Sequence, residues 1–581
     1  MKINIHVLIF VLIAIIAALN DIVIYIFNSQ YWISLILIST ILISLLIFFI
    51  KKQKIKIFNN FEKMDLLFLI PYLLIMSTLF LSCDQRLDTF NYHLYLQENP
   101  FIDKVNFDRL LSHSFLFPLG DRMAYIFRSI LGYRFGMILS FYTMIILFFQ
   151  VKKILTDIFP NLKYKKLITI FSGLVLLTAT PNWRSTTFHI DNFSMVIFLE
   201  FILIFVKNEN IFKNKAMLYY ISLLSGISIG IKVINAVLVA VFVIVIVIRD
   251  IKEFLKNIKI KDVIICIFLV FLPFIVYAID NYIQTGNPVF PYYNNIFKSE
   301  YYEISAGLDE RFGMPNALYA FVWPILVTVE PLLGFDYDIF REPLWAIGYI
   351  MCIGNVCVFS FEHKQNKIKE LSILGIILAL AWAVFMLGYI RYALIIPILY
   401  YIIISSNIIK IINEFKYDNI KMIFDIVKLT FLFLLLLIII LFGIKTIIFR
   451  IYEAYIGRID INNYSFEDDV YEIDGVWATV YFNSGMIDTI RNKTTPIYNL
   501  DITREINCDT SRFTQEVQNE LFEELKNKRV FTVTSDVLYN QTIKYLEDVN
   551  YEIIDEKIYK NSKFQNINNN WYILEIKSIE N

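Results

Sequence analysis

The sequence has few charged residues and few cysteines. Of 581 residues, 18% are Asp, Glu, Lys or Arg and five are Cys, whereas soluble domains carry about 25% charged residues. The low charge argues against a disordered chain, a coiled coil and an ordinary cytosolic enzyme, and the scarcity of cysteine argues against a disulfide scaffold. Because 53 basic residues balance 53 acidic ones, no net positive field favours nucleic acid as a partner.

Apolar residues make up 57% of the chain and fall into long runs. A run of about 20 apolar residues spans a bilayer as a helix, so we interpret the chain as an all-α polytopic membrane protein with about 13 transmembrane helices. The first run shows no small-residue cleavage pattern, and we expect a retained helix there. The candidate spans lie near residues 5–27, 31–50, 64–82, 134–150, 167–180, 193–206, 217–230, 232–248, 263–279, 343–361, 371–388, 392–409 and 423–448.

Lysine and arginine indicate the orientation, because cytoplasmic loops carry an excess of them. With the N-terminus inside, the six predicted cytoplasmic loops hold 24 Lys and Arg, whereas the external loops 83–122, 181–192 and 280–342 hold four, one and three. An odd number of spans then puts the C-terminus outside. We therefore predict a multi-pass protein of the cell (inner) membrane with an extracytoplasmic C-terminal domain.

The composition changes after residue 448, where Asn, Asp, Glu and Lys become frequent. Residues 529–535, 551–557 and 571–576 are predicted strands, and 537–548 is a predicted helix. Residues 449–581 contain no Gly-rich phosphate loop and no metal-spaced Cys/His cluster, so we assign this small α/β domain no chemistry. The predicted organisation is an N-terminal helical hairpin at 1–60, a main transmembrane module at 61–448 and this domain.

Polar residues collect in the two long external loops, 83–122 and 280–342, and long ordered loops usually serve a function. The first loop carries Asp84 and Asp88 just beyond a predicted helix end. Residues 115–132 then alternate apolar and charged groups, which is typical of an amphipathic helix on the membrane surface. The structural alternative is a solvated loop whose acidic residues cap helices.

Four shorter polar segments fall on the same predicted side, at residues 181–192, 226–232, 281–291 and 389–392. Asp191 stands where a helix is expected to begin, so it is also a candidate helix cap. Lys232 stands where a helix is expected to end, and Arg391 lies at the tip of a helical hairpin. Both cations have an alternative role as membrane anchors.

Carboxylates, cations and aromatic rings thus gather on the outer face of an apolar bundle. That combination suits a lipid whose isoprenoid tail lies in the membrane and whose charged head lies at its surface. Cations bind phosphate, and aromatic rings stack on sugars. A carboxylate accepts the proton of an attacking hydroxyl or holds a divalent metal.

At these residues the chain, over roughly 60–410, resembles the GT-C superfamily of integral-membrane glycosyltransferases, which use polyprenyl-phosphate sugars. Five motifs of the family have counterparts in this sequence, in the same order along the chain. They are its first and second acidic positions, its glycine–lysine hairpin, a loop of bacterial members and a late Arg-Tyr pair. The counterparts are Asp88-x-x-Asn91-Tyr92-His93, His189-Ile190-Asp191, Gly226-x-x-x-Gly230-x-Lys232, Thr285-Gly286-Asn287-Pro288-Val289-Phe290-Pro291 and Arg391-Tyr392.

The resemblance implies a role for each matching residue. Asp88 would be the general base or a metal ligand, and Asp191 would complete the acidic pair. Lys232 and Arg391 would hold the lipid phosphate. The other implied substrate-binding residues are Tyr92 and His93, which would line the donor sugar pocket, together with His189, Asn287 and Asp84, the alternative to Asp88 as the working acid.

The implied enzyme moves a hexosyl or pentosyl group from a polyprenyl-phosphate donor to a cell-envelope glycan, lipid or protein, as in bacterial mannosyl- and arabinosyltransferases. In the expected reaction, the acceptor hydroxyl displaces polyprenyl phosphate directly at the anomeric carbon, with Asp88 taking the proton. A divalent metal (Mg²⁺ or Mn²⁺) is left open as a cofactor, because His93, His113 and His189 lie near acids without diagnostic ligand spacing.

Two alternative functions share part of this pattern. A lipid-linked polysaccharide polymerase or ligase would use a pyrophosphate-linked donor and would favour several external arginines, whereas Arg391 stands without such a cluster. A lipid or glycan transporter would place ionisable groups near the bilayer midplane and often shows inverted repeats. The sequence shows no repeat, and Asp21 and Glu200 are among the few buried candidates.

Overall fold

The computed structural model describes most of the chain. The described residues are 2–53, 56–58, 61–81, 89–101, 115–162, 165–207, 211–301, 317–329, 342–359, 366–385, 390–415, 419–457, 475–479, 497–499, 523–535, 539–548, 550–559 and 570–579.

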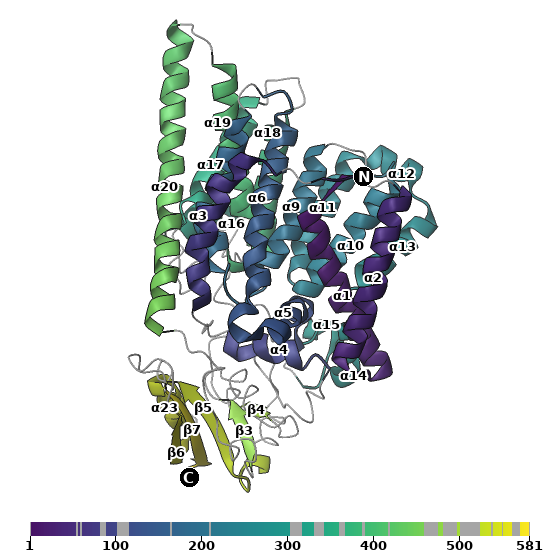
Figure 1. Ribbon diagram of the computed structural model, residues 1–581, viewed down its shortest axis with the longest axis vertical. Helices are drawn as coiled ribbons and strands as arrows, with labels where there is room; N and C mark the ends of the chain where they lie inside the picture. The colour runs from purple at the N-terminus through teal and green to yellow at the C-terminus, as the bar shows by residue number, and fades with distance from the viewer. Residues whose placement is uncertain are drawn as a thin grey trace.

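Helices dominate the described part of the chain (Figure 1). Their apolar runs favour helices because, in lipid, a helix satisfies its backbone hydrogen bonds within one segment. The helices are α1 Ile5–Phe27, α2 Tyr31–Gln53, α3 Leu66–Ser77, α4 Leu94–Glu98, α5 Leu119–Phe135, α6 Ile138–Ile158, α7 Lys166–Leu174, α8 Ala179–Trp183, α9 Asp191–Lys207, α10 Lys215–Ile231, α11 Asn235–Arg249, α12 Ile251–Asn257, α13 Ile260–Phe271, α14 Ile275–Thr285, α15 Asn294–Phe297, α16 Ala317–Val329, α17 Leu344–Phe359, α18 Lys367–Phe385, α19 Ile395–Glu414 and α20 Asn419–Gly457.

Each of the thirteen predicted spans coincides with helix in the structure. Among the described residues, six helices are long and apolar enough to cross a membrane, and α13 with α14 forms a seventh crossing if the bent pair is one span. That pair bends by 69° at a break containing Pro273, whose ring cannot continue the helix. The chain is thus a multi-pass membrane protein, while thirteen crossings stays a prediction.

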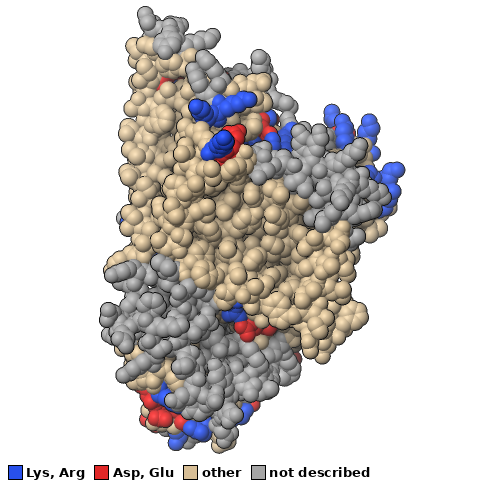
Figure 2. All heavy atoms as spheres, viewed as in Figure 1, with Lys and Arg blue, Asp and Glu red and all other residues tan. Residues whose placement is uncertain are grey.

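The bundle has two chemically different ends. Helices α4, α5, α14 and α15 lie at one end, whereas α12 lies at the other (Figure 1). On the face in Figure 2, a broad band without described charged residues separates the two ends, and Lys and Arg gather beside α12 and α18. We call the end with α4 and α5 the motif end and the other the basic end.

The first helix belongs to the main bundle. Buried Val7, Phe10 and Ala14 of α1 join one apolar core with α6, α9 and α10, and the Phe10 ring lies 5.6 Å from that of Phe193. β1 (Lys2–Asn4) pairs in parallel with β2 (Lys56–Phe58). The helical hairpin predicted at 1–60 therefore contributes α1 to the same core as the rest, and its boundary stays a prediction.

Helix α5 differs from the amphipathic surface helix that we expected. Its charged residues Asp121, Arg122 and Arg128 are buried, whereas Ile130 and Phe135 are more than half exposed. The charged side chains turn inward because each has a partner on a neighbouring segment. The expected water-facing polar side is therefore wrong for residues 115–132, and the exposed large side chains described on this helix are apolar.

The C-terminal residues form a five-stranded sheet in the order β4-β3-β5-β7-β6. Its strands are β3 Val476–Thr479, β4 Ile497–Asn499, β5 Val530–Ser535, β6 Tyr551–Tyr559 and β7 Trp571–Ser578. β3 pairs in parallel with β4 and β5, whereas β7 pairs antiparallel with β5 and β6. Helix α23 (Tyr539–Asp548) contacts β5 and β6, so the three strands and one helix predicted from sequence are present.

The sheet lies at the motif end (Figure 1) and packs directly on it. One buried apolar cluster joins its residues Trp477, Phe531 and Trp571 to Tyr92, Leu96 and Phe188 of the helical part. A second cluster joins Val530 and Leu574 to Phe115 and Phe290. The sheet thus shares its core with the segments that carry three of the sequence motifs.

Candidate functional site

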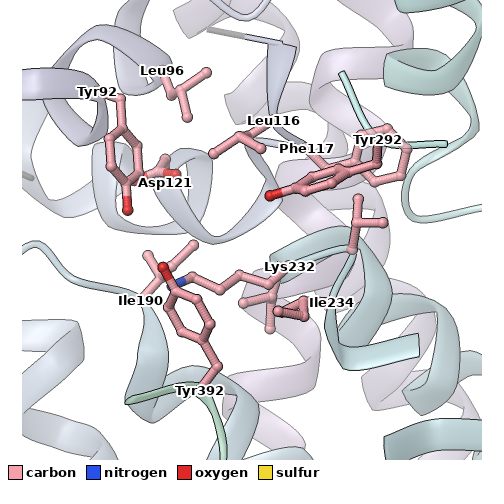
Figure 3. Close-up of a pocket in the computed structure, with 12 residues that line it drawn as sticks. Tyr92, Leu96, Leu116, Phe117, Asp121, Ile190, Lys232, Ile234, Tyr292 and Tyr392 are labelled. Atoms are coloured by element: carbon pink, nitrogen blue, oxygen red, sulfur yellow. The ribbon is translucent and has the colours of Figure 1, made fainter. Parts of the chain in front are cut away.

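A small pocket opens at the motif end, where segments from six parts of the chain meet (Figure 3). It has a volume of about 50 Å³. Its lining residues combine one acid, one lysine, three tyrosines and apolar side chains: Tyr92, Leu96, Leu116, Phe117, Asp121, Ile190, Ile231, Lys232, Val233, Ile234, Tyr292 and Tyr392. A pocket with a few polar side chains between apolar walls is the arrangement expected for binding a lipid headgroup or a small polar ligand.

Lys232 follows the last residue of α10 and is placed by the glycine motif. A Cβ on Gly226 would lie 2.2 Å from the Val270 carbonyl oxygen, so only glycine lets α10 approach α13 this closely. The chain then leaves the helix in an extended conformation at Lys232. The negative end of the α10 dipole favours a cation there, and the Lys232 side chain remains 14% exposed.

Asp191 is the ionic partner of Lys232. It occupies the first turn of α9, where the helix dipole favours an acid, and its Oδ1 accepts a hydrogen bond from the Lys232 ammonium. Arg184 Nε lies 3.6 Å and His189 Nδ1 3.8 Å from Asp191 Oδ2. The second acidic motif and the glycine–lysine motif are therefore in direct contact.

A second acid, Asp121, lines the pocket beside Tyr92 (Figure 3). It lies in the first turn of α5, outside the candidate membrane spans, and its Oδ1 is 2.7 Å from His93 Nδ1. Burial raises the pKa of the Asp121 carboxyl, while His93 and Lys232 oppose that rise and Asp191 adds to it. A carboxyl held in this way retains its proton to higher pH than a solvated one.

Three tyrosines form the aromatic walls of the pocket. Figure 3 shows the hydroxyls of Tyr92 and Tyr292 pointing toward the space beside the Lys232 side chain. The Lys232 ammonium lies 3.8 Å from the centre of the Tyr392 ring, within the range of a cation–π contact. Flat rings around a cation and an acid can hold a sugar face while its phosphate meets the cation.

Asn287 shapes the segment that supplies Tyr292. Gly286 ends α14 with a φ of 74°, the left-handed conformation that glycine adopts without strain. The Asn287 amide then donates to the Tyr292 carbonyl at 2.9 Å and its oxygen accepts from the Val289 N–H at 3.0 Å. Its side chain is thus engaged within the turn, and its implied contact with substrate stays a prediction.

Other sequence-predicted residues have different outcomes. Tyr92 lines the pocket, and Tyr392 does so from the turn that contains Arg391, whose side chain is outside the described residues. Asp84 and Asp88 also lie outside the described residues. Their roles stay predictions.

His93 does not have the position that we expected. It is fully buried and lies behind Asp121 instead of lining the pocket. The reason is a π-helical turn at Thr89–His93, which sends Tyr92 toward the pocket and His93 into the protein. Its ring centre lies 5.0 Å from that of His189.

Asp121 and Tyr292 were missed as site residues. The alternation of apolar and charged residues in 115–132 predicted that the charged side chains face solvent. No local pattern indicates that Asp121 faces a pocket while the neighbouring Arg122 does not. The neighbouring Pro-Val-Phe-Pro turn does indicate an ordered loop before Tyr292, but not that the next ring enters a pocket.

A separate charge cluster lies near the site without lining the pocket. Arg122 donates to both oxygens of Asp21 at 2.7–3.0 Å, and the Tyr277 hydroxyl donates to Asp21 at 2.6 Å. Asp21, which a transporter would need as an exchanging group, is thus bound to a permanent cation. Glu200 in α9 contacts Gln150.

The described residues offer no metal-binding cluster. Within the ranges given above, no three His, Cys, Asp or Glu side chains converge as metal ligands, and Asp84 and Asp88 are not among the residues searched.

Comparisons with known proteins give a distant likeness. No family model and no curated protein matches the chain. Among solved structures, it is similar to the crystal structure of ArnT from Cupriavidus metallidurans in the apo state, with a TM-score of 0.46 and 11% identity over 87% of this chain and 97% of ArnT. The structure of the same protein bound to undecaprenyl phosphate matches with a TM-score of 0.49 and 10% identity over 88% and 97% of the two chains.

Proposed function

We propose that this protein is a membrane glycosyltransferase that transfers a sugar from a polyprenyl-phosphate donor to a cell-envelope glycan, lipid or protein on the outer face of the membrane. The observation that carries the proposal is Lys232. This lysine reaches a pocket with aromatic and apolar walls, and its partner Asp191 also lies within 4 Å of Arg184 and His189.

Lys232 is suited to a phosphate that arrives from the lipid side. Its side chain is 14% exposed, and its ammonium contacts the Asp191 carboxylate and the Tyr392 ring, so an anion can replace part of these contacts. When that happens, Asp191 keeps Arg184 and His189 within 4 Å, which limits the cost of the exchange. Lys232 thus stabilises the departing polyprenyl phosphate as the sugar–phosphate bond breaks.

The charge of the pocket favours one phosphate over two. Lys232 is the cation among the described residues that line it, whereas a pyrophosphate-linked donor would call for several cations. The polymerase or ligase alternative therefore has less support from this part of the chain. The transporter alternative also loses a candidate, because Asp21 is fixed by Arg122.

Outer-face activity rests on the contrast between the two ends of the bundle. The pocket lies at the motif end, and Lys and Arg gather at the opposite end (Figure 2), where cytoplasmic loops are expected. Tyr293 at the motif end and Lys256 in α12 are both exposed. In intact cells, a membrane-impermeant maleimide should label the Tyr293→Cys variant above the wild-type background and should not label the Lys256→Cys variant. The opposite pattern would mean that the motif end faces the cytoplasm.

The decisive experiment measures phosphate recognition and sugar transfer with matched lysine variants. Lys232→Met removes the cation at the pocket, and Lys215→Met removes a similar lysine that pairs with Asp262 at the basic end. A hydrogen bond to a charged group contributes about 1.5–3 kcal/mol, or about 10- to 100-fold in Kd. Purified Lys232→Met should therefore bind undecaprenyl phosphate at least about tenfold more weakly than wild type, while Lys215→Met should bind normally.

Transfer is assayed in membranes with a panel of radiolabelled undecaprenyl-phosphate hexoses and pentoses. Wild type should move label from at least one donor into endogenous envelope material, and Lys232→Met should not do so at a comparable rate. Equal binding and equal transfer by wild type and Lys232→Met would reject the assignment of Lys232. No transfer by wild type from any donor would reject the proposed function.

A further inference from the structure

Asp121 is a carboxylate at the pocket for which the sequence motifs supply no role. It lines the pocket, its side chain is 1% exposed, and Figure 3 shows it on the far side of the pocket from Lys232. One end of the pocket therefore carries a cation suited to phosphate, and the other carries an acid. A sugar whose phosphate lies on Lys232 would extend toward the Asp121 end.

His93 fixes the orientation of this carboxyl. The His93 Nδ1 and Asp121 Oδ1 atoms are 2.7 Å apart, and both side chains are buried. With the carboxylate ionised, Nδ1 carries the hydrogen and donates it to Oδ1. The hydrogen bond then occupies one oxygen of Asp121 and leaves the other available to the pocket.

The environment of Asp121 also suits proton transfer. The charged and titratable groups that act on it are His93 from the π-helical turn, Lys232 after α10 and Asp191 at the start of α9. Burial is the largest influence and raises the pKa of the carboxyl. A base whose pKa is raised toward the working pH takes a proton more effectively than a solvated carboxylate.

We propose that Asp121 is the general base that deprotonates the acceptor hydroxyl, and that His93 is the residue that positions it. This assignment rests on the proposed glycosyl transfer. It leaves Asp88 with the other role that the resemblance implies, that of a metal ligand. Because His93 is sealed from the pocket, it acts through Asp121 and does not touch the substrate.

The step balances without another reactant. The acceptor oxygen forms a bond to the anomeric carbon while its proton moves to the free oxygen of Asp121. The bond between the anomeric carbon and the phosphate oxygen breaks, and its electron pair leaves with polyprenyl phosphate beside Lys232. After the products depart, Asp121 returns its proton to water.

The test compares Asp121→Asn with Glu98→Gln, a second acid at the motif end that pairs with Arg128. Using the undecaprenyl-phosphate sugar that wild type transfers, Asp121→Asn should lower kcat about 10²- to 10⁴-fold. Its affinity for undecaprenyl phosphate should stay close to that of wild type, because Lys232 is intact. Glu98→Gln should keep wild-type kcat.

Two His93 variants separate positioning from packing. In His93→Asn the side-chain amide can still donate to Asp121, whereas in His93→Leu no donor remains. Loss of the donor raises the pKa of Asp121 further, so the acid limb of the kcat–pH profile should move to higher pH in His93→Leu. His93→Asn should keep the limb near its wild-type position with a smaller loss of kcat, and this pair decides the matter if Asp121→Asn does not fold.

Each outcome supports or overturns the assignment. Wild-type kcat in folded Asp121→Asn overturns it, as does an unmoved acid limb in His93→Leu. Loss of undecaprenyl phosphate binding in Asp121→Asn would make Asp121 a binding residue and overturn its role as base. The absence of any transfer by wild type overturns the proposed function and this assignment together, and is thus distinguished from failure of Asp121 alone.

Discussion

Two ion pairs at the motif end combine an aspartate with a cation, but their surroundings differ. In the Asp21–Arg122 pair, a planar guanidinium meets both carboxylate oxygens, Tyr277 donates to the same carboxylate, and the rings of Tyr31 and Tyr125 lie 4.8 and 5.1 Å from the guanidinium carbon. In the Asp191–Lys232 pair, the cation is a flexible ammonium with a partly exposed side chain at a pocket. The first pair has no position left for a ligand, whereas the second can exchange one partner for another.

Residue type alone therefore does not distinguish a charged residue with a structural role from one with a functional role. Arg presents a rigid fork that suits permanent pairing, and Lys presents a mobile point charge. What differs most is the surroundings: aromatic rings and carboxylate enclose Arg122, and a pocket faces Lys232. The following predictions test this division.

The largest expected effect is on folding, from Asp21→Ala. Removal of one partner leaves a buried uncompensated charge, which costs about 3–5 kcal/mol, and the Arg122 side chain is only 3% exposed. Thermal or denaturant unfolding in detergent should show this loss. The double variant Asp21→Leu/Arg122→Met should recover much of it, and a single variant as stable as the double would contradict the structural role.

Lys232→Met should have a smaller effect on stability. Asp191 keeps Arg184 and His189 within 4 Å when Lys232 is removed, so we expect a loss of about 1–2 kcal/mol, below the usual cost of breaking a buried pair. Arg122→Met is the comparison variant, measured by unfolding in the same detergent. If Lys232→Met unfolds as readily as Arg122→Met, Lys232 belongs with the structural pair.

A third prediction concerns pH and Asp121. At a pH below the pKa of the unfolded chain, the carboxyl is protonated in both states and carries no penalty. As pH rises from 3.8, the ordinary pKa of an Asp carboxyl, through the raised pKa of folded Asp121, the unfolded chain releases the proton first, so the free energy of unfolding falls. Asp121→Asn does not titrate and should become increasingly more stable than wild type across this window. Parallel stability–pH curves for the two proteins would contradict the burial of an ionisable group at the pocket.

That stabilisation should accompany the loss of kcat proposed for the same variant. A site residue held in an unfavourable environment lowers stability while serving the reaction. The unfolding measurement therefore also checks that an inactive Asp121→Asn protein is folded.

The sequence was sufficient to predict features encoded in nearby residues. The long apolar runs gave the helical segments, and the alternation near the C-terminus gave β5, α23, β6 and β7. Asp191 and Lys232, which lie 41 residues apart, were both candidate site residues from their motifs, and the structure shows that they form an ion pair. Strands β3 and β4, of four and three residues, were not predicted, because so short a segment is defined by its pairing partners.

The site was less predictable where contacts are distant. Arg122 pairs with Asp21, which lies 101 residues away in the sequence. The alternation of apolar and charged residues in 115–132 is typical of a surface helix and does not indicate that Arg122 is buried. The π-helical turn at Thr89–His93 likewise places Tyr92 at the pocket and buries His93 behind Asp121. Where a buried charged residue pairs with a residue of another element, only the tertiary structure shows which face of the helix is buried.

The smallest expected effect comes from Tyr392, whose ring centre lies 3.8 Å from the Lys232 ammonium. A cation–π contact at a partly exposed site contributes about 0.5–1 kcal/mol, so Tyr392→Leu should raise the Kd for undecaprenyl phosphate about two- to fivefold. Tyr392→Phe keeps the ring and should bind as wild type does. A large loss in Tyr392→Phe would instead assign the contact to the hydroxyl, and unchanged binding in Tyr392→Leu would show that Lys232 keeps its position without the ring. Either result would mean that aromatic rings do not explain the difference between the two ion pairs. The geometry of the carboxylate contacts would explain it instead, because Arg122 also lies against tyrosine rings but is held by both oxygens of Asp21.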